Sequence, residues 1–229
     1  MGLFDSFFGK GKVLYFPGCT PKYLDAQVQK RHEKLLNQFE IDYITLPKEE
    51  VCCGRPALDY GYVEDFNKLQ QTNTDLFQAH KIKKIITSCP SCYYTFKKKY
   101  EDLDMEIEHI SQTILDNIDK IQKKYEGQKV TFFDPCNPYK LPELYENPRK
   151  ILETLGLRVV DLPFTKEKSL CCGKSLQHIA PKVGTEMANA ILKDVKTRTL
   201  ITTSTDCCLH FKETPGHHIK IRELSEVLL

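Results

Sequence analysis

The sequence has no hydrophobic run close to the roughly 20 residues that are needed to cross a bilayer, so no transmembrane helix is predicted. Its first residues, MGLFDSFFGKGK, are too short and wrongly flanked for a secretory signal peptide. Charge is nearly balanced, with a formal net charge of +2, so nothing points to nucleic acid as a partner. We therefore expect a cytoplasmic protein.

Motifs for nucleotide cofactors are also missing. No G-x-G-x-x-G opens a helix after an expected strand, so a Rossmann site for a flavin or a nicotinamide is not supported. The segment FFGKGKV is not a phosphate-binding loop, because its lysine is not followed by Ser or Thr. The compact C-x2-C-x2-C run of ferredoxins is absent as well. These absences predict that hydride transfer and substrate oxidation take place on other polypeptides.

The overall composition is that of an ordinary globular chain: 229 residues, 41% hydrophobic and 28% charged. The N-terminal extension, residues 1–12, fits the myristoylation pattern at Gly2 and Ser6. It also carries four apolar side chains, Leu3, Phe4, Phe7 and Phe8. We interpret them either as a frayed end packed on its own domain or as a peripheral contact with a partner subunit or a membrane surface.

Against these absences stand ten cysteines. In a chain without an export signal, clustered cysteines indicate metal binding or redox chemistry rather than structural disulfides. They form two sets of five: Cys19, Cys52, Cys53, Cys89 and Cys92, then Cys136, Cys171, Cys172, Cys207 and Cys208. Equivalent cysteines lie 115 to 119 positions apart, and the segments MEIEHISQTI and IKIRELSEVL repeat at a similar offset. The chain is therefore interpreted as an internal duplication.

Each half alternates β-rich apolar runs with helical patterns. Strands are expected within 12–19, 41–47 and 81–89, and within 129–136, 158–163 and 199–208. Helices are expected at 25–39, 63–80, 147–157 and 184–196. This alternation predicts an α/β fold in which helices flank parallel sheets. The expected architecture is two duplicated lobes related by a pseudo-two-fold, at 13–125 and 129–229, joined near residues 125–128.

The cysteines follow expected strands or stand at turns into expected helices, and ligands of parallel sheets bind beyond the carboxyl ends of the strands. We expect each lobe to bring its five thiols together there. Both sets contain a vicinal pair before a glycine, in Cys52-Cys53-Gly54 and Cys171-Cys172-Gly173. Adjacent thiols chelate one small ion poorly, but at a flexible turn they can reach different metals of a polynuclear cluster. An iron–sulfur cluster suits such a thiolate set.

The first half has 32 residues between Cys19 and Cys52 and 35 between Cys53 and Cys89, followed by the motif CPSC. This spacing resembles the CCG-type cysteine-rich iron–sulfur family. Its members include the B and D subunits of heterodisulfide reductase, lactate utilisation protein A, and iron–sulfur subunits of glycolate oxidase and anaerobic glycerol-3-phosphate dehydrogenase. In the second half, DPCNPYKLPELYENPRKIL is similar to the family's Asp-Pro-Cys segment and Pro-Arg helix start. The resemblance covers nearly the whole chain from Val13 onward.

The resemblance implies one or two [4Fe–4S] clusters with all ten cysteines as ligands. For the first set it implies the non-cubane, disulfide-cleaving cluster associated with the B subunit of heterodisulfide reductase. The second set departs from the family, with Asn137 where His is frequent and Ser204 in the place of Cys89. An ordinary cubane, a zinc ion or no metal stay open there. Adjacent residues leaving a strand point to opposite sides of a sheet, so Cys207 is expected to be a better ligand than Cys208.

The sequence thus predicts an iron–sulfur subunit of a larger oxidoreductase, of the heterodisulfide reductase or lactate, glycolate and glycerol-3-phosphate dehydrogenase type. It would transfer electrons or reduce a disulfide, with flavoprotein or ferredoxin-type subunits as partners. One alternative is a stand-alone thiol–disulfide oxidoreductase that uses Cys89 and Cys92, because a C-x-x-C motif opening a helix lowers a thiol pKa. The other is a zinc-stabilised scaffold protein.

Overall fold

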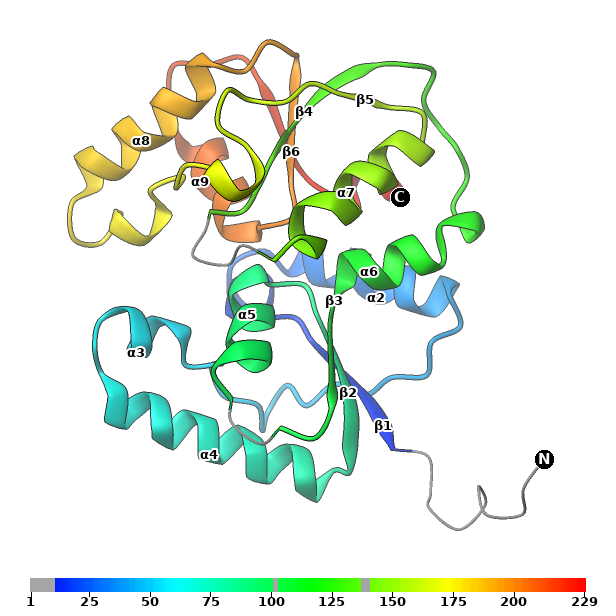
Figure 1. Cartoon of the computed structure of the whole chain (residues 1–229), viewed down its shortest axis with the longest axis vertical. Coiled ribbons are helices and arrows are strands. Elements are labelled where there is room, and N and C mark those ends of the chain that lie inside the picture. The colour runs from blue at the N-terminus through cyan, green and yellow to red at the C-terminus, as the bar shows by residue number, and fades with distance from the viewer. Residues whose placement is uncertain (1–10, 101–102, 137–140) are drawn as a thin grey trace.

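The chain folds into two α/β lobes stacked one above the other (Figure 1). The computed structural model describes residues 11–100, 103–136 and 141–229. The apolar N-terminal residues and Asn137, about which the sequence made predictions, lie outside these described residues.

The first lobe is built on a three-stranded parallel sheet in the order β1-β2-β3. Its strands are β1 (Lys12–Phe16), β2 (Ile82–Thr87) and β3 (Glu106–His109). Three consecutive residues of β1 are buried, as expected when helices cover both faces of a parallel sheet. The helices are α1 (Cys19–Tyr23), α2 (Ala26–Gln38), α3 (Arg55–Asp59), α4 (Val63–Ala79), α5 (Pro90–Lys98), α6 (Ile110–Asp116) and the 3-10 turn η1 (Ile118–Lys120).

The second lobe has a four-stranded parallel sheet in the order β5-β4-β6-β7. Its strands are β4 (Lys129–Phe133), β5 (Arg158–Val159), β6 (Thr199–Thr202) and β7 (Lys220–Glu223). Helix α7 (Glu143–Thr154) begins four residues before the start that the sequence suggested at Asn147. The others are η2 (Lys166–Lys168), η3 (Lys174–Leu176), α8 (Pro181–Lys193), α9 (Thr205–Glu213) and α10 (Ser225–Leu228).

The strand expected at 41–47 does not form, and only Ile44 pairs with β1, through an isolated parallel bridge to Leu14. Its amide donates to the Val13 carbonyl and its carbonyl accepts from the Tyr15 amide, both at 2.9 Å. The counterpart β5 is also short, because both segments lie at a sheet edge where only one side offers backbone partners. The order of the pairing segments is nevertheless the same in both lobes, which confirms the predicted duplicated α/β architecture.

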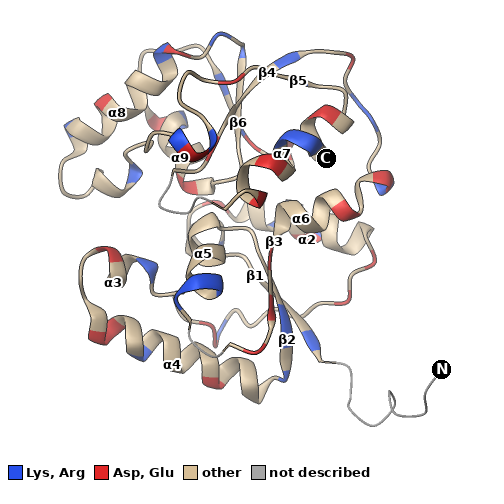
Figure 2. Cartoon of the chain, in the orientation of Figure 1, with Lys and Arg blue, Asp and Glu red and all other residues tan. Residues whose placement is uncertain are grey.

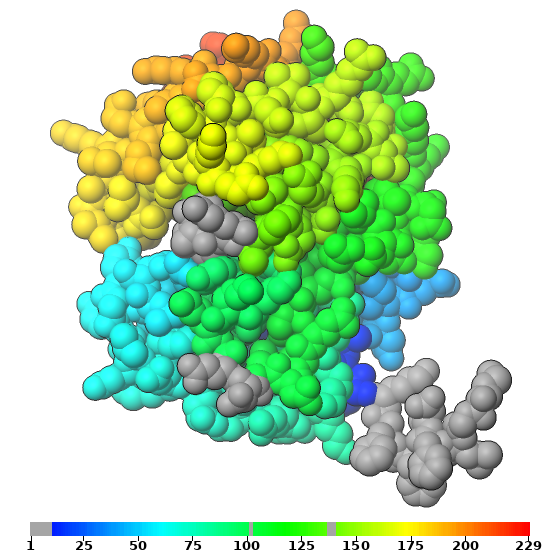
Figure 3. All heavy atoms as spheres, in the orientation of Figure 1, coloured from blue at the N-terminus to red at the C-terminus, as the bar shows by residue number. Residues whose placement is uncertain are grey.

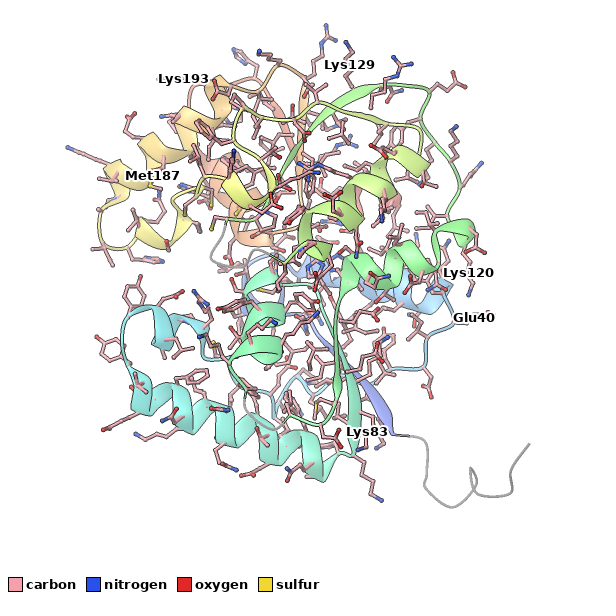
Figure 4. The ribbon with its side chains drawn as sticks, in the orientation of Figure 1. Glu40, Lys83, Lys120, Lys129, Met187 and Lys193 are labelled. Carbon is pink, nitrogen blue, oxygen red and sulfur yellow. The ribbon has the colours of Figure 1, made fainter. Side chains whose placement is uncertain are left out.

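The largest buried apolar cluster lies between the lobes rather than inside either one. Helices α2 and α6 of the first lobe meet α7 and α10 of the second there, with Leu35, Leu36, Ile110, Ile114, Ile151, Leu152, Val227 and Leu228 among the buried side chains. Each lobe has a further cluster of its own. The side chains that fill the region between the ribbons are seen in Figure 4, where Glu40 and Lys120, 3.9 Å apart, are labelled at one end. The shared core joins the lobes into one body.

In the view of Figure 2, acidic and basic residues are interspersed over both lobes. Within the described ranges, no helix combines the length and the apolar character that are needed to cross a membrane. The space-filling view shows a notch at one end of the lobe interface, between the α3 region and the segment before α8 (Figure 3). The cysteine-bearing loops lie toward this end.

Candidate metal centre

The same hydrogen-bonded turn precedes a helix in both lobes and positions part of each cysteine set. The hydroxyl of Thr87, at the end of β2, accepts a hydrogen bond from the amide of Cys89 at 3.3 Å. The hydroxyl of Thr202, at the end of β6, accepts from the amide of Ser204 at the same distance. Cys89 and Ser204 are then the N-caps of α5 and α9. The alignment of Ser204 with Cys89 therefore holds in three dimensions.

The first set is brought together by the close approach of the Cys19 loop to α5. Gly18 has φ +85°, and a Cβ at this position would lie 2.8 Å from the Cys89 Cβ and 3.5 Å from the Cys92 Sγ. Only glycine permits this approach and this backbone conformation together. The loop thereby places Cys19, the one exposed cysteine of the ten, beside the buried end of α5.

Direct side-chain interactions link the rest of the first set. The Cys53 thiol interacts with those of Cys52 and Cys92, and Cys92 interacts with Cys89. Cys19 lies within the electrostatic reach of Cys89 and Cys53. All five predicted thiols of the first lobe are therefore neighbours. A cavity of about 30 Å³ opens beside them, lined by four of the cysteines and by Lys22, Tyr23 and Glu50 among others.

The second set brings four of its five cysteines together. The Cys172 and Cys207 sulfurs lie 3.1 Å apart, and Cys171 interacts with both Cys172 and Cys136. Cys208 instead interacts with the Lys212 side chain and lies in the field of Glu223 and Glu226, and burial raises its pKa to about 12.

The separation of Cys207 and Cys208 has a different cause from the one expected. Both lie in the first turn of helix α9, not at the end of a strand. Successive side chains of a helix are rotated by about 100°, so only one of the pair faces the neighbouring thiols. The strand argument was therefore wrong, and Cys207 as the better ligand stays a prediction.

The glycines after both vicinal pairs aim backbone amides at sulfur. The Gly54 amide donates to the Cys52 Sγ and the Gly173 amide to the Cys171 Sγ, each at 3.4 Å. Both glycines are left-handed, with φ +85° and +89°, as the turn prediction required. Hydrogen bonds of this kind favour the charged form of a thiol, which is the form that binds metal.

In each set, contact with neighbouring thiols lowers the pKa of one cysteine. Contact with the Cys52 and Cys92 thiols lowers the pKa of Cys53, although burial opposes this. Contact with Cys136 and Cys172 lowers the pKa of Cys171 in the same way. Hydrogen bonds from neighbouring thiols thus favour the charged form of these two sulfurs.

The basic residues at the matching helix starts are engaged in ion pairs. Arg55 lies 2.7 Å from Asp59 and stacks over the Tyr94 ring at 5.1 Å. Lys174 lies 3.2 Å from Glu213. They contribute positive charge near each vicinal pair, but as members of these ion pairs rather than as bases directed only at the sulfurs.

The two cysteine groups face the same interlobe region. Thr20, next to Cys19, donates to the Asp206 carboxylate, next to Cys207, at 2.7 Å. The Tyr60 hydroxyl at the end of α3 donates to the Ser175 carbonyl in η3 of the other lobe, at 3.2 Å. Asp206 also contributes to the raised pKa of Cys19, about 11, after burial and Cys89. The loops of one lobe therefore help to set the environment of the other lobe's cysteines.

A buried ion pair beside the second set was not assigned a role from the sequence. Arg149 of α7 donates to both oxygens of Asp134, at 2.5 and 2.9 Å. Asp134 stands two residues before Cys136 and also accepts from the Lys166 amide at 2.8 Å. It thus ties the end of β4 to the loop that leads to Cys171. The sequence signal for this ion pair was the Asp-Pro-Cys segment, which contains Asp134, and the Pro-Arg helix start, which contains Arg149.

The donor chemistry of these groups fits a thiolate-held cluster. Within the described ranges, no three Cys, His, Asp or Glu side chains already stand in the geometry of a single-ion site. What the structure provides is neighbouring thiols, amide donors directed at sulfur, and glycines that allow close approach. A larger hollow of about 580 Å³ lies elsewhere, between residues 123–127 and Arg158, and its lining is mostly exposed charged side chains without cysteine.

Comparison with known proteins gives a family match in both halves. The model of the cysteine-rich CCG domain matches residues 13–97 and again residues 130–212. These two ranges contain all ten cysteines.

Curated relatives include iron–sulfur proteins and oxidoreductase subunits. An uncharacterized iron–sulfur protein of Methanocaldococcus jannaschii is 26% identical over 211 residues, covering 90% of this chain and 42% of that protein. The D subunit of dihydromethanophenazine:CoB–CoM heterodisulfide reductase from Methanosarcina acetivorans is 28% identical over 199 residues (81% and 49%). The B subunit of fumarate reductase (CoM/CoB) from Methanothermobacter marburgensis is 29% identical over 214 residues (89% and 42%). The chain spans less than half the length of each of these relatives.

Among solved structures, glutamate racemase of Francisella tularensis is similar at a TM-score of 0.42 and 13% identity, covering 95% of this chain and 79% of that one. A likeness at this level bears on neither the fold nor the chemistry of the cysteine groups.

Proposed function

The chain belongs to the CCG cysteine-rich domain family, and we propose that it is an iron–sulfur subunit that carries electrons within a multi-subunit oxidoreductase. The main observation behind this proposal is that both family-matched halves bring their thiols together at one end of the interface between the lobes. Relatives described as subunits of heterodisulfide reductase and fumarate reductase support it. We propose residues 13–125 and 129–229 as the two functional lobes.

In the first lobe, the five neighbouring thiols are the proposed ligands of a [4Fe–4S] cluster: Cys19, Cys52, Cys53, Cys89 and Cys92. When bound, such a cluster stores and releases single electrons. The vicinal pair and the fifth thiolate favour the non-cubane form over a cubane with four ligands. Cys19 is the exposed member, so the proposed approach of a disulfide substrate or a partner's redox group is from its side.

In the second lobe, four neighbouring thiols are the proposed ligands: Cys136, Cys171, Cys172 and Cys207. Four thiolates match a [4Fe–4S] cubane, and they also match tetrahedral zinc. We propose a cluster rather than zinc because this lobe repeats the vicinal pair and glycine of the first lobe, and a cubane because a fifth neighbouring thiol is missing. Cys208, expected from the sequence as a fifth ligand, lies toward Lys212 and is not part of this proposal.

The proposed partners are the subunits that supply or remove electrons, a flavoprotein or a ferredoxin-type protein. No G-x-G-x-x-G dinucleotide motif and no compact ferredoxin cysteine run occur in this sequence. The electron donor and acceptor would then be provided by other polypeptides.

Anaerobic purification and reconstitution test this proposal directly. We expect broad visible absorption and about eight iron and eight sulfide ions per chain when both sites are filled. About four iron ions with one zinc ion would place zinc in the second lobe. A colourless zinc protein would favour the scaffold function instead. A metal-free chain that reduces disulfides and loses this activity in Cys89→Ser would favour the stand-alone thiol–disulfide enzyme.

A further inference from the structure

A chain of buried polar side chains crosses the interlobe core close to the first cysteine set. The Tyr15 hydroxyl of β1 lies 3.3 Å from both His32 Nδ1 and Ser88 Oγ. On its other side, the His32 Nε2 lies 3.6 Å from the Glu223 carboxylate of β7, in the second lobe. Each of these four residues is at most 1% exposed. The network therefore joins the two lobes through a region that is otherwise apolar.

One end of this network reaches the loops of the first cysteine set. Ser88 directly precedes Cys89, and its hydroxyl donates to the Pro17 carbonyl, two residues before Cys19, at 2.9 Å. The other end reaches the surface. Arg31, which is partly exposed, donates to the Ser225 hydroxyl at 3.0 Å, and this hydroxyl donates to Glu223. Hydrogen bonds thus run from Arg31 at the surface to Glu223 and from His32 to the loops of the first site, and the 3.6 Å between His32 Nε2 and the Glu223 carboxylate separates these two segments.

The histidine in this path has an unmet hydrogen-bonding capacity. His32 Nε2 is fully buried and has no hydrogen-bond partner within bonding distance among the described residues. A buried polar nitrogen without a partner costs free energy. The nearby carboxylate, 3.6 Å away, comes within hydrogen-bond distance after a small shift of either side chain. In both protonation states the Nε2–H can then donate to Glu223, and protonation of Nδ1 adds a positive charge beside this buried carboxylate.

We propose that His32 is a redox-linked proton-binding site of the first cysteine set. This inference rests on the proposed function. When a one-electron carrier reduces a cluster held at the first site, one proton from solvent would bind the His32 ring and balance the added charge. Reoxidation releases both. Only an N–H bond forms or breaks at the histidine.

The hydroxyls of Tyr15 and Ser88 connect the protonation of His32 to the cysteine loops. With neutral His32, the Tyr15 hydroxyl donates to the Nδ1. With both ring nitrogens protonated, Nδ1–H donates to the Tyr15 oxygen, and the Tyr15 proton turns toward Ser88 Oγ. Ser88 continues to donate to Pro17. Protonation therefore reverses one hydrogen bond and directs a positive dipole toward the site that has gained negative charge.

Neighbouring charges support a carboxylate partner that stays ionised. Burial alone would raise the pKa of Glu223, but His32 and the Ser225 hydroxyl and amide outweigh it, so this pKa lies below its usual value. Burial raises the pKa of Tyr15 far above its usual range, so its hydroxyl keeps its proton. The other titratable and charged groups around the path are Arg31, Glu33, Tyr43, His109, Cys208, Lys212 and Glu226.

The test is a redox titration of the first site between pH 6 and pH 9, followed by its electron paramagnetic resonance signal in the reconstituted chain. We expect the wild-type midpoint potential to fall with rising pH over part of this range, by up to about 59 mV per pH unit, the value for one proton per electron. His32→Gln should abolish this slope. Glu223→Gln, which keeps the side-chain shape, should do the same and covers the case in which His32→Gln fails to fold.

His109→Asn is the matched control. His109 is equally buried at the end of β3 and caps α6 by accepting from the Ser111 amide at 3.3 Å. Burial and the nearby His32 lower its pKa to about 3, so it does not titrate in this range. Its variant should keep the wild-type slope. Two results would overturn the inference but leave the proposed function standing. One is a filled first site whose wild-type midpoint potential does not change with pH. The other is a pH dependence that is unchanged in both His32→Gln and Glu223→Gln. Failure of the wild-type chain to take up a cluster would overturn it together with the proposed function.

Discussion

Replacement of Arg149 by leucine should loosen the second cysteine site specifically. Arg149 binds both oxygens of Asp134 and also reaches Asp161 at 2.8 Å and Thr165 at 2.6 Å. Through Asp134 these contacts join the end of β4 to the loop before Cys171. Without the guanidinium, the Asp134 carboxylate stays buried with only the Lys166 amide and the Thr165 hydroxyl as donors.

The magnitude follows from the burial of the pair. The side chains of Arg149 and Asp134 are 8% and 2% exposed. Loss of one partner of such a buried ion pair costs about 3–5 kcal/mol, because the other charge remains without compensation. In a chain of this size, one kcal/mol shifts the melting temperature by about 2–4 °C, so Arg149→Leu should melt roughly 6–20 °C lower.

Thermal unfolding of the metal-free chain, followed by circular dichroism, measures this loss. The matched control is Asp161→Asn, since Asp161 is 48% exposed and its ion pair with Arg149 should contribute about 0–1 kcal/mol. In reconstituted protein, Arg149→Leu should lower the metal content of the second site and spare the first. The double variant Asp134→Asn/Arg149→Leu should be destabilised by less than the sum of the single changes. Equal melting of Arg149→Leu and Asp161→Asn would refute the reasoning.

Further outcomes concern the thiols and one buried histidine. Cys92→Ala should reduce bound iron, while Cys208→Ala should leave it nearly unchanged; equal losses would place Cys208 in the second site after all. Cys53→Ser should remove one site's share of iron with little change in far-UV circular dichroism, because the apolar clusters stabilise the fold without metal. Global unfolding of this variant would show instead that folding depends on the metal. His109 is neutral in the fold, with a pKa of about 3 against 6.5 for a free side chain, so stability should fall as pH drops from about 6.5 toward 3, by up to about 1.4 kcal/mol per unit. Urea unfolding at several pH values should show a flatter acid limb in His109→Asn.

Much of the architecture was predictable because its signals are local or repeated. The spacing of the cysteines identified the duplication, and the apolar runs before Cys89 and Cys136 identified two central strands, β2 and β4. Central strands pair on both sides, so their own composition suffices to specify them. The segment around Ile44 has similar composition but lies at the edge, where the geometry of its neighbours decides how many residues pair.

The remaining parts of the site depend on contacts that no local pattern reports. His32 and Glu223 are far apart in the sequence and meet only because the lobes pack against each other. The ion pair of Asp134 and Arg149 likewise requires α7 to lie beside the end of β4. Periodicity places a residue on a face of its own element, but it does not identify the charged residue on another element that will face it.

The N-caps of α5 and α9 explain how one fold can accommodate two unequal sites. In the second lobe, the Ser204 hydroxyl accepts from the Cys207 amide at 3.3 Å and so caps its helix. In the first lobe, the described structure shows no capping hydrogen bond from the Cys89 side chain. A missing side-chain cap costs a helix about 1 kcal/mol, so α5 gives up stability that α9 retains. The position can cap a helix or offer a thiol to a metal, but not both. The first lobe has the residue suited to binding and the second the residue suited to folding, and this choice predicts that the second site is the one to lose metal first.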